Sequence, residues 1–245
     1  MISFLKNHPF PVEAFFERSL VLTFAIQKKQ ISGFIPSKLT LDIFQDEWAF
    51  LAVAMVQTNS LRPKGFPKIL GNDFFLIGYR IFVRYQNQAG KNLRGLFILK
   101  SETDKKKMQY LGNVFTHYNY TTTDIEITED DQLETIKSNL SNFKVTVSKE
   151  KKDLVLPVSS PFDSWKEARR FAGPMPFTFT CNDHKKSVLI IEGLRNNWKP
   201  DPVHVVDYCF DFMSKSEFSK AKLASAFEVR NIPYHWKKGK LEIWQ

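Results

Sequence analysis

Cysteine is scarce in this sequence, since Cys181 and Cys209 are the only two in 245 residues. Two thiols provide no disulfide framework, and no CxxC pair or Cys/His cluster offers the ligand spacing of a zinc site. The sequence also lacks a GxGxxG, a P-loop and a GxSxG motif, the common signatures of dinucleotide sites, nucleoside triphosphate sites and α/β-hydrolases. We therefore expect neither a metal nor a cofactor, and a protein that works in a reducing compartment.

Long apolar runs and internal repeats are missing as well. The N-terminal region has one short apolar run, residues 19–26, which is too short to span a bilayer. Glu13 and Glu17 precede this run and no small-residue cleavage site follows it, so it makes a poor secretory signal. Tandem repeats of about 20–50 residues, which mark solenoids and propellers, are not visible. We expect a cytoplasmic protein that does not insert into a membrane.

Acidic residues are outnumbered, because 35 Lys and Arg stand against 26 Asp and Glu and give a net charge of +9. The lysines form short runs, most of them with Asp or Glu close by, which is typical of a solvated surface. A nucleic-acid or anionic-surface binder stays open as an alternative explanation of this charge. No RNP motif or helix-turn-helix supports it, so we do not expect nucleic acid as a partner.

Aromatic and β-branched residues are abundant. Hydrophobic residues make up 43% of the chain and 23 residues are Phe, enough to fill a large core or to line an apolar pocket. Runs rich in Val, Ile, Phe, Thr and Tyr, separated by Gly, Pro, Asn or Asp, predict strands. These strands are expected at residues 20–26, 39–44, 48–56, 74–85, 93–101, 123–128, 143–148, 176–181, 187–194 and 203–213. Residues 87–91 and 181–186 predict hairpin turns.

Helices are fewer. Local signals predict them at residues 11–18, from 101 or 103 to about 111, 164–173 and 216–228. The clearest start is the capping box that begins at Ser164, and Gly173-Pro174 is the usual stop. Many antiparallel strands with a few separate helices predict an α+β fold that is mainly antiparallel β, dominated by a large sheet or barrel. We expect one domain over residues 1–245, with an internal seam near residues 149–161 left open.

Two arginines lie on one face of the strand predicted around residues 77–85. Because side chains alternate along a strand, Arg80, Phe82 and Arg84 share a face, and Tyr79 is the neighbour of Arg80 in sequence. Such a pair of arginines could bind a carboxylate or a phosphate in bidentate fashion. The alternative is that both arginines face water or pair with acidic neighbours.

Two lysines and a histidine are candidates for chemistry. Lys68 or Lys100 could serve as an amine nucleophile if burial lowered its pKa, although a salt bridge between Lys100 and Glu102 is the favoured interpretation. The alternation also predicts Arg94 on the same side as Lys100 and Glu102. His117 lies in a polar and aromatic stretch and could act as an acid or base, or could be a packed, hydrogen-bonded side chain.

Several long blocks of the sequence point to a known family. They include "LDIFQDEWAFLAVAMVQTNSLRPKGFPKILGNDFFLIGYRIFVRY", "LRGLFILKSETDKKKMQYLGNVFTHYNYTTTDI", "EARRFAGPMPFTF" and "IPYHWKKG". On these blocks, which extend over nearly the whole chain, the sequence resembles the YqjF-like family of uncharacterised bacterial proteins. That family is in turn similar to acetoacetate decarboxylase. The resemblance implies a cone-shaped antiparallel β-barrel around an internal cavity, with a few helices packed outside.

The resemblance also directs attention to a lysine motif. Acetoacetate decarboxylase forms a Schiff base through a lysine in a Gly-aromatic-Pro-Lys-Lys run. Residues 65–68 resemble the first four residues of this run, but Ile69 stands in place of the second lysine. These residues also precede the strand at 77–85, whereas the motif would be expected to follow it. By order along the chain the matching place is residues 111–118, where Thr116 and His117 stand and the lysine pair is absent. The resemblance therefore implies a scaffold that has lost the Schiff-base amine.

We accordingly expect a small-molecule-binding β-barrel whose ligand is a small organic acid. The candidate ligand-binding residues are Arg80, Arg84, Tyr79, Thr116, Tyr118 and Glu102, and the catalytic candidates are His117, Lys68 and Lys100. The first alternative is a lysine-dependent decarboxylase or aldolase that acts on a keto acid through Lys68 or Lys100. The second is the nucleic-acid or anionic-surface binder described above. A homo-oligomer is compatible with the sequence.

Overall fold

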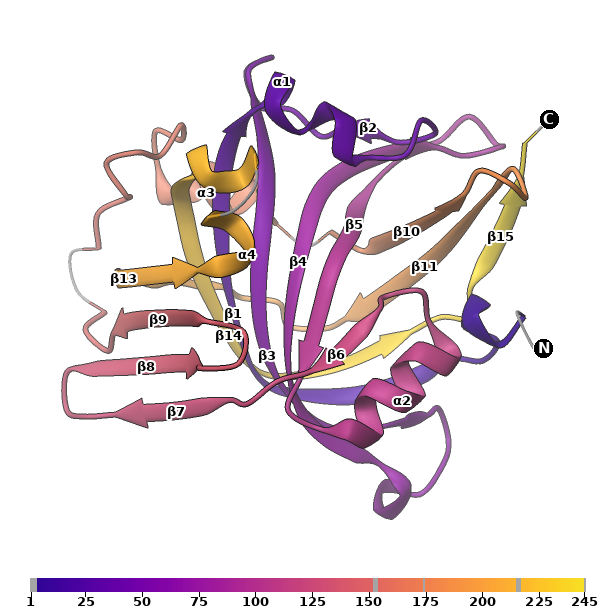
Figure 1. The fold of residues 1–245 in the computed structure, drawn as a ribbon, viewed down its shortest axis with the longest axis horizontal. Coiled ribbons are helices and arrows are strands. Elements are labelled where there is room, and N and C mark those ends of the chain that lie inside the picture. Colours follow the sequence, from indigo (N-terminus) through magenta and orange to yellow (C-terminus); the bar gives the residue numbers. More distant parts are fainter. Residues whose placement is uncertain (1–3, 152–153, 174, 215–216, 245) are drawn as a thin grey trace.

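The chain folds around a closed ring of β-strands. The computed structural model describes residues 4–151, 154–173, 175–214 and 217–244 (Figure 1). In spatial order the ring strands are β14 (Lys222–Trp236), β1 (Val12–Gln27), β3 (Trp48–Pro63), β4 (Asn72–Gln86), β5 (Asn92–Thr103), β10 (Phe177–Asn182) and β11 (Ser187–Arg195). The ring closes because β14 pairs with β1 on one side and with β11 on the other. Every pairing in the ring is antiparallel except that of β5 with β10, so the predicted mainly antiparallel α+β class is confirmed.

Shorter strands extend the ring and build a second sheet. The extensions are β2 (Thr40–Leu41) on β4, β6 (Tyr120–Thr122) on β5, β12 (Asp201–Pro202) on β14 and β15 (Lys240–Ile243) on β11. The second sheet, at the left of Figure 1, has the order β13 (Val205–Phe210), β9 (Phe143–Ser148), β8 (Leu133–Ser138) and β7 (Glu126–Glu129). The seam near residues 149–161 stays a prediction.

The helices are short. The α-helices are α1 (Lys28–Ile31), α2 (Lys106–Phe115), α3 (Trp165–Phe171) and α4 (Asp211–Ser214), and the 3-10 helices are η1 (Leu5–Asn7), η2 (Ser32–Phe34), η3 (Lys68–Leu70) and η4 (Glu217–Lys220). Across the described ranges, no helix combines the length and the apolar character that a membrane crossing requires.

The ring strands bury side chains on both faces, as the period of two along each strand demands. On the outer face Leu22, Ile77 and Tyr79 pack with Val145 and Phe210 of the second sheet in one apolar cluster. Burying a side chain of this kind stabilises the fold by about 1.5–3 kcal/mol, so this face anchors the second sheet to the ring.

The inner face holds two smaller apolar clusters. Phe50 and Phe82 pack with Phe162 near α3, and Phe74 packs with Met108 of α2. Side chains from both clusters also border an open space inside the ring. The ring is therefore filled near α3, and α2 covers part of its inner face.

Two helices predicted from local signals are wrong, and long-range pairing explains both. Residues 12–18 belong to β1, whose backbone pairs with β3 on one side and β14 on the other. Residues 222–228 belong to β14 and pair with β1, although Phe218, Leu223 and Phe227 are buried as the helical pattern predicted. Ser216, where that helix was expected to begin, lies outside the described residues. Ladder hydrogen bonds on both edges of a strand outweigh a local helical preference.

Other local signals give the right structure. Ser164 accepts a hydrogen bond from the backbone N–H of Glu167 and caps α3, as the capping box predicts. The turn at residues 87–91 joins β4 and β5, with Gly90 at a φ of 75°. β8, at residues 133–138, was not predicted, because its sequence LETIKS alternates apolar and polar residues only weakly.

A register shift in the β4–β5 ladder overturns one expected face. Tyr79 pairs with Lys100, but the next residue, Arg80, pairs with Ile98, so β5 carries one extra residue at this point. The bulge puts Ile98 on the inner face and Lys100 on the outer face. The unbroken alternation predicted that Arg94 and Lys100 lie on the same side of the sheet. Because of the bulge they lie on opposite sides, so this prediction is wrong.

An ion-pair network ties the second sheet to the ring. Arg18 of β1 hydrogen-bonds both to Glu134 of β8 and to Glu228 of β14. The Arg18 side chain is 13% exposed, and those of Glu134 and Glu228 are 10% and 9% exposed. Arg230, 52% exposed, adds two hydrogen bonds of 2.9 Å each to Glu228. Burial acts to raise the pKa of Glu228, but Arg230 and Arg18 outweigh it and hold that pKa below its ordinary value.

Candidate functional site

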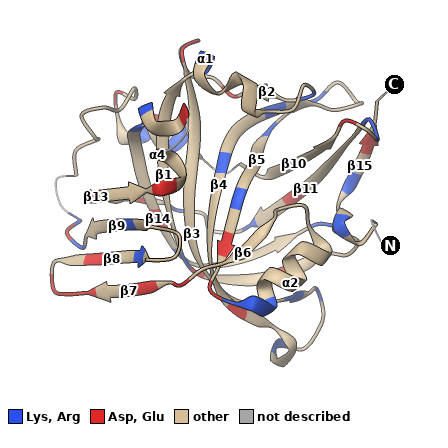
Figure 2. Cartoon of the chain, in the orientation of Figure 1, with Lys and Arg blue, Asp and Glu red and all other residues tan. Residues whose placement is uncertain are grey.

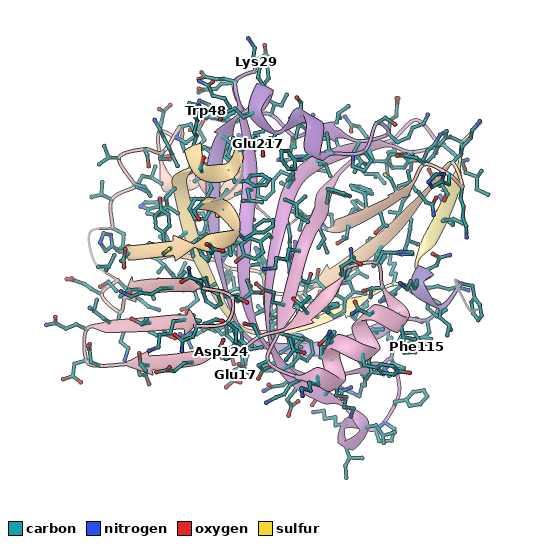
Figure 3. The ribbon with its side chains drawn as sticks, in the orientation of Figure 1. Glu17, Lys29, Trp48, Phe115, Asp124 and Glu217 are labelled. Atoms are coloured by element: carbon teal, nitrogen blue, oxygen red, sulfur yellow. The ribbon has the colours of Figure 1, made fainter. Side chains whose placement is uncertain are left out.

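The ring encloses a cavity of about 280 Å³. Its wall is mainly apolar and comes from all seven ring strands and from α2. Phe115, labelled in Figure 3, contributes from the C-terminal end of α2. A volume near the lower end of the range for ligand pockets fits a small organic molecule.

Small residues on neighbouring strands leave this space open. Ala54 of β3 pairs with Gly78 of β4, and Ala52 pairs with Arg80. A Cβ atom at Gly78 would lie 2.8 Å from Nε of Arg80 and 2.9 Å from its Nη2. The guanidinium of Arg80 therefore folds back over the backbone of Gly78, and the missing side chain makes room for it.

Arg80 has no partner for its charge in the described part of the chain. Its side chain forms no ion pair there, and its Nε is buried without a hydrogen-bond partner. Burial lowers the pKa of Arg80, and the tyrosine hydroxyls of Tyr120, Tyr234 and Tyr118 lie close enough to oppose this shift. A buried donor without a partner costs about 1–3 kcal/mol, more for a charged group, so this arrangement calls for a functional explanation.

Arg195, at the end of β11, is a second cation in the cavity wall. Its Nη1 donates a hydrogen bond of 3.3 Å to the hydroxyl of Tyr234, and its Nη2 is buried without a partner. The guanidinium also stacks on Trp198, with 4.3 Å between its carbon and the ring centroid. Burial lowers the pKa of Arg195, and the charge of Arg80 acts in the same direction. The aromatic contacts hold the group in place but leave its charge uncompensated.

Three tyrosines surround the two arginines. Burial raises the pKa of Tyr120 to about 12, and burial also raises the pKa values of Tyr118 and Tyr234. All three hydroxyls are therefore neutral at pH 7 and can donate hydrogen bonds. Tyr118 makes a hydrogen bond with Thr178 of β10.

The rest of the wall contains little charge. None of the lining residues that the structure describes is Asp, Glu or Lys. Arg62 lines the cavity but pairs with Glu13 at 2.6 Å. His8 is buried, its pKa is lowered by that burial, and its Nδ1 has no partner. The cavity thus combines apolar walls with two uncompensated arginines.

The structure brings three of the predicted site residues to this cavity: Arg80, Thr116 and Tyr118 line it. Thr116 directs its hydroxyl to the backbone oxygen of Gly112 at 2.7 Å, which fixes the end of α2. The other six predicted residues do not line the cavity.

Arg84 lies four residues beyond Arg80 on β4 but has an acidic partner. Its Nε donates to Oδ1 of Asp42 at 2.6 Å, and the Nε of Arg94 donates to Oδ2 of the same carboxylate at 2.7 Å. The side chain of Asp42 is fully buried, and the nitrogen Nη2 of Arg94 also donates to the backbone oxygen of Phe171. This arrangement is the acidic pairing that the sequence left open as the alternative.

Tyr79, Lys100 and Glu102 lie together on the outer face of β4 and β5, where Figure 2 shows basic and acidic positions side by side. Lys100 pairs with Glu102 at 3.0 Å, which is the favoured salt bridge, and its ammonium lies 5.8 Å from the ring of Tyr79. Ser141 donates a hydrogen bond to Glu102. These residues join the ring to the second sheet.

Lys68 and His117 also lie away from the cavity. Lys68 begins η3 in the loop between β3 and β4 and is exposed. His117 follows α2, and its Nε2 is 3.3 Å from Oδ1 of Asn7. Burial lowers the pKa of His117, and nearby Lys6 adds to that effect.

Sequence reasoning missed most of the polar wall. Arg195, Tyr234, Trp198 and Thr178 come from the second half of the chain, where the sequence predicted strands, helices and a turn but none of the residues of this cavity. A signal existed for one of them, because Arg195 ends the apolar strand VLIIEGLR, where an arginine is out of keeping with a buried run.

Comparison with solved structures shows where the fold has been seen before. Acetoacetate decarboxylase from Legionella pneumophila superposes with a TM-score of 0.62 at 10% identity, and the match covers 96% of this chain and 88% of that one. The enduracididine biosynthesis enzyme MppR, complexed with the condensation product of pyruvate and imidazole 4-carboxaldehyde, matches with a TM-score of 0.62 at 10% identity, covering 95% and 89%. An acetoacetate decarboxylase-like enzyme from Sphingomonas wittichii RW1 gives a TM-score of 0.57 at 9% identity, covering 98% and 94%. These likenesses confirm the expected acetoacetate decarboxylase-like fold, and at such identities they show the fold alone.

Sequence comparisons add the family. No curated protein sequence matches the chain. The family model DUF2071, described as an uncharacterized conserved protein, matches residues 14–238 and so spans the ring from β1 to β14. The resemblance to an uncharacterised family with this fold is confirmed, and the chain belongs to the DUF2071 family.

Proposed function

We propose that the protein binds a small organic acid inside its ring of strands, with Arg80 as the anchor of the carboxylate. The observation that carries this proposal is the guanidinium of Arg80, which lines the cavity, forms no ion pair with a residue that the structure describes, and has a buried Nε without a partner among those residues. A guanidinium presents paired N–H donors that match a carboxylate, and such charge-assisted hydrogen bonds are about twice as strong as neutral ones. A bound carboxylate would satisfy the group that the protein leaves unsatisfied.

The walls support an organic ligand over a simple inorganic anion. Phe82 lies on the same strand as Arg80, Leu96 and Ile98 lie on the neighbouring β5, and Ala52 and Ala54 of β3 leave room for the carbon skeleton. Apolar walls with a few directed polar groups are the common design of small-molecule sites. MppR, a fold relative, is described in complex with pyruvate, which is a small organic acid.

Loss of Schiff-base chemistry is part of the proposal. A nucleophilic lysine would have to reach the ligand, and the described lining residues include no lysine. Lys68 is exposed in the β3–β4 loop, and Lys100 is paired with Glu102 on the opposite face of the sheet. These placements favour a binding protein over a lysine-dependent decarboxylase or aldolase. Its two free cysteines favour the cytoplasm as the place where it works.

Binding of matched acid and amide pairs tests the proposal. Isothermal titration would compare isovalerate and phenylacetate with isovaleramide and phenylacetamide, which have the same shapes without the charge. We expect each acid to bind at least tenfold more tightly than its amide. Arg80→Gln should remove this preference, because one charged hydrogen bond contributes about 1.5–3 kcal/mol, or about 10–150-fold in affinity.

Arg84→Gln is the matched control, since Arg84 lies on the same strand and face but pairs with Asp42 outside the cavity. It should keep the preference for acids. Equal binding of acids and amides by the wild-type protein, or an unchanged preference in Arg80→Gln, would overturn the proposal.

A further inference from the structure

We infer that the ligand carries two negative charges, and that Arg80 and Arg195 bind them together from opposite parts of the ring. The inference deepens the proposed function and rests on it, because it specifies the charge of the acid that the cavity takes. The ligand class is a small dianion, either a dicarboxylate or a molecule with a phosphate group.

The charge balance of the cavity leads to this class. Of the three arginines in the wall, Arg62 is neutralised by Glu13, whereas Arg80 and Arg195 have no acidic partner among the described residues. The tyrosine hydroxyls near them are neutral at pH 7, because burial raises their pKa values. His8 adds no compensating negative charge. Among the described lining residues, the cavity wall therefore carries two positive charges without an acidic partner.

A singly charged acid leaves this balance incomplete. It would neutralise Arg80 and leave the half-buried Arg195 without an acidic partner among the described residues, and a charge that is partly removed from water is unfavourable without a counter-ion. A dianion neutralises both groups at once. The two arginines also repel each other, since the charge of Arg80 helps to lower the pKa of Arg195, and a dianion between them reverses this repulsion.

The architecture brings the two arginines together from distant parts of the sequence. Arg80 extends from β4, and Arg195 extends from the end of β11 on the other side of β5 and β10 in the ring. Tyr234 links them, because its hydroxyl accepts the hydrogen bond from Arg195 and also lies close enough to Arg80 to affect its pKa. Each arginine keeps a buried nitrogen without a partner, Nε in Arg80 and Nη2 in Arg195. Both arginines thus line the same cavity.

Two glycines keep both cations in position. Gly78 accommodates the guanidinium of Arg80, as described above. A Cβ atom at Gly193 would lie 2.0 Å from the hydroxyl of Tyr234, so the glycine on β11 leaves room for the group that holds Arg195. On both strands a glycine makes room for the arginine or for the tyrosine that binds it, and this similarity supports a common binding role for the two arginines.

Dicarboxylates and their monomethyl esters test the charge of the ligand directly. Malonate, succinate, glutarate and adipate would each be titrated against the corresponding monomethyl ester, which has nearly the same shape and one charge fewer. Inorganic phosphate forms a separate arm. The full chain is used at pH 7.5, with low chloride and constant ionic strength, because screening weakens charge selectivity.

We expect at least one dicarboxylate to bind tenfold or more tightly than its ester, or inorganic phosphate to bind tenfold or more tightly than acetate. The first result identifies two separate carboxylates, and the second identifies a single doubly charged group. Arg195→Gln should reduce the preference for the dianion to less than threefold, while the affinity for the monomethyl ester or acetate changes little. Arg195→Lys, which keeps the charge, should retain part of the preference.

The possible failures are distinguishable. If dianions and monoanions bind equally, the inference is wrong and the proposed function stands, because acids still bind in preference to amides. If neither kind of anion binds better than the neutral amides, the proposed function fails as well. If Arg195→Gln does not fold, as judged by circular dichroism, Tyr234→Phe replaces it. An unchanged dianion preference in whichever variant folds would overturn the role of Arg195.

Discussion

Replacing Arg80 with Met should make the ligand-free protein more stable. In most proteins the loss of a buried arginine is destabilising, because its carboxylate partner is left alone. Arg80 has no such partner in the described structure, and its buried Nε makes no hydrogen bond. Met has a similar length and no polar atom, and it fills irregular space well. The substitution therefore removes an electrostatic penalty without opening a large hole.

The size of the effect follows from two terms. An unsatisfied buried donor costs about 1–3 kcal/mol, and replacing buried charged groups by apolar ones of similar volume is often neutral or stabilising by about 1–4 kcal/mol. Arg80 also faces a cavity that can hold water, which reduces the penalty, so we expect a gain of about 1–2 kcal/mol. For a chain of this size each kcal/mol moves Tm by about 2–4 °C, which gives a rise of about 2–8 °C.

Arg84→Met is the sharpest control, because it is the same substitution four residues further along the same strand and on the same face. It leaves the fully buried Asp42 with Arg94 alone, so Tm should fall and the free energy of unfolding should drop by about 1–2 kcal/mol. Differential scanning calorimetry and urea titration of both variants, without added ligand, measure whether each substitution raises or lowers the Tm and the free energy of unfolding. If Arg80→Met lowers Tm as Arg84→Met does, then Arg80 is a structural residue and the reasoning behind the site fails.

Three further predictions concern the ion-pair network around Arg18, the cavity wall and the proposed loss of the Schiff-base lysine. Arg18→Met should destabilise the protein by about 2–4 kcal/mol at pH 7 in urea titration, because it leaves buried carboxylates unpaired. The pKa of Glu228 is lowered in the folded protein, so the ionised carboxylate of Glu228 stabilises the fold above pH 4.5. The difference in the free energy of unfolding between this variant and the wild type should therefore shrink as the pH falls below that value. Gly193→Ala should displace Tyr234, cost about 1–3 kcal/mol in urea titration and weaken acid binding in calorimetry. Treatment with pyruvate and borohydride should leave no adduct on any lysine by mass spectrometry, and an adduct on Lys68 would restore the lysine-dependent alternative.

Much of the fold could be predicted because its local signals and its long-range pairing agree. The strands at 48–56, 74–85 and 93–101 lie within β3, β4 and β5, since their β-branched and aromatic residues suit a buried sheet. The turn at 87–91 and the cap at Ser164 depend on a few neighbouring residues, and both form as predicted.

Prediction failed where distant contacts decide the outcome. Residues 12–18 and 222–228 carry local signals for helix, but in the fold the first segment pairs with residues 230–236 of β14 and the second with residues 20–25 of β1. The local sequence contains no information about the partner strand. The bulge beside Arg80 is a property of two strands in register, and it reverses the face on which Lys100 lies. The same limit hid Arg195, whose importance depends on its nearness to Arg80 across the ring.

The two arginines of β4 show why charge alone does not identify a binding site. Arg80 and Arg84 have the same side chain, the same strand and the same face, and no sequence pattern distinguishes them. The segment after β2 places Asp42 beside Arg84, whereas the described residues of the wall around Arg80 include tyrosines and alkyl groups but no carboxylate. Arg84 is therefore part of the protein's own electrostatic balance, and we propose that a ligand in the cavity balances the charge of Arg80. The proposal thus assigns binding to the arginine for which the described chain supplies no acidic partner.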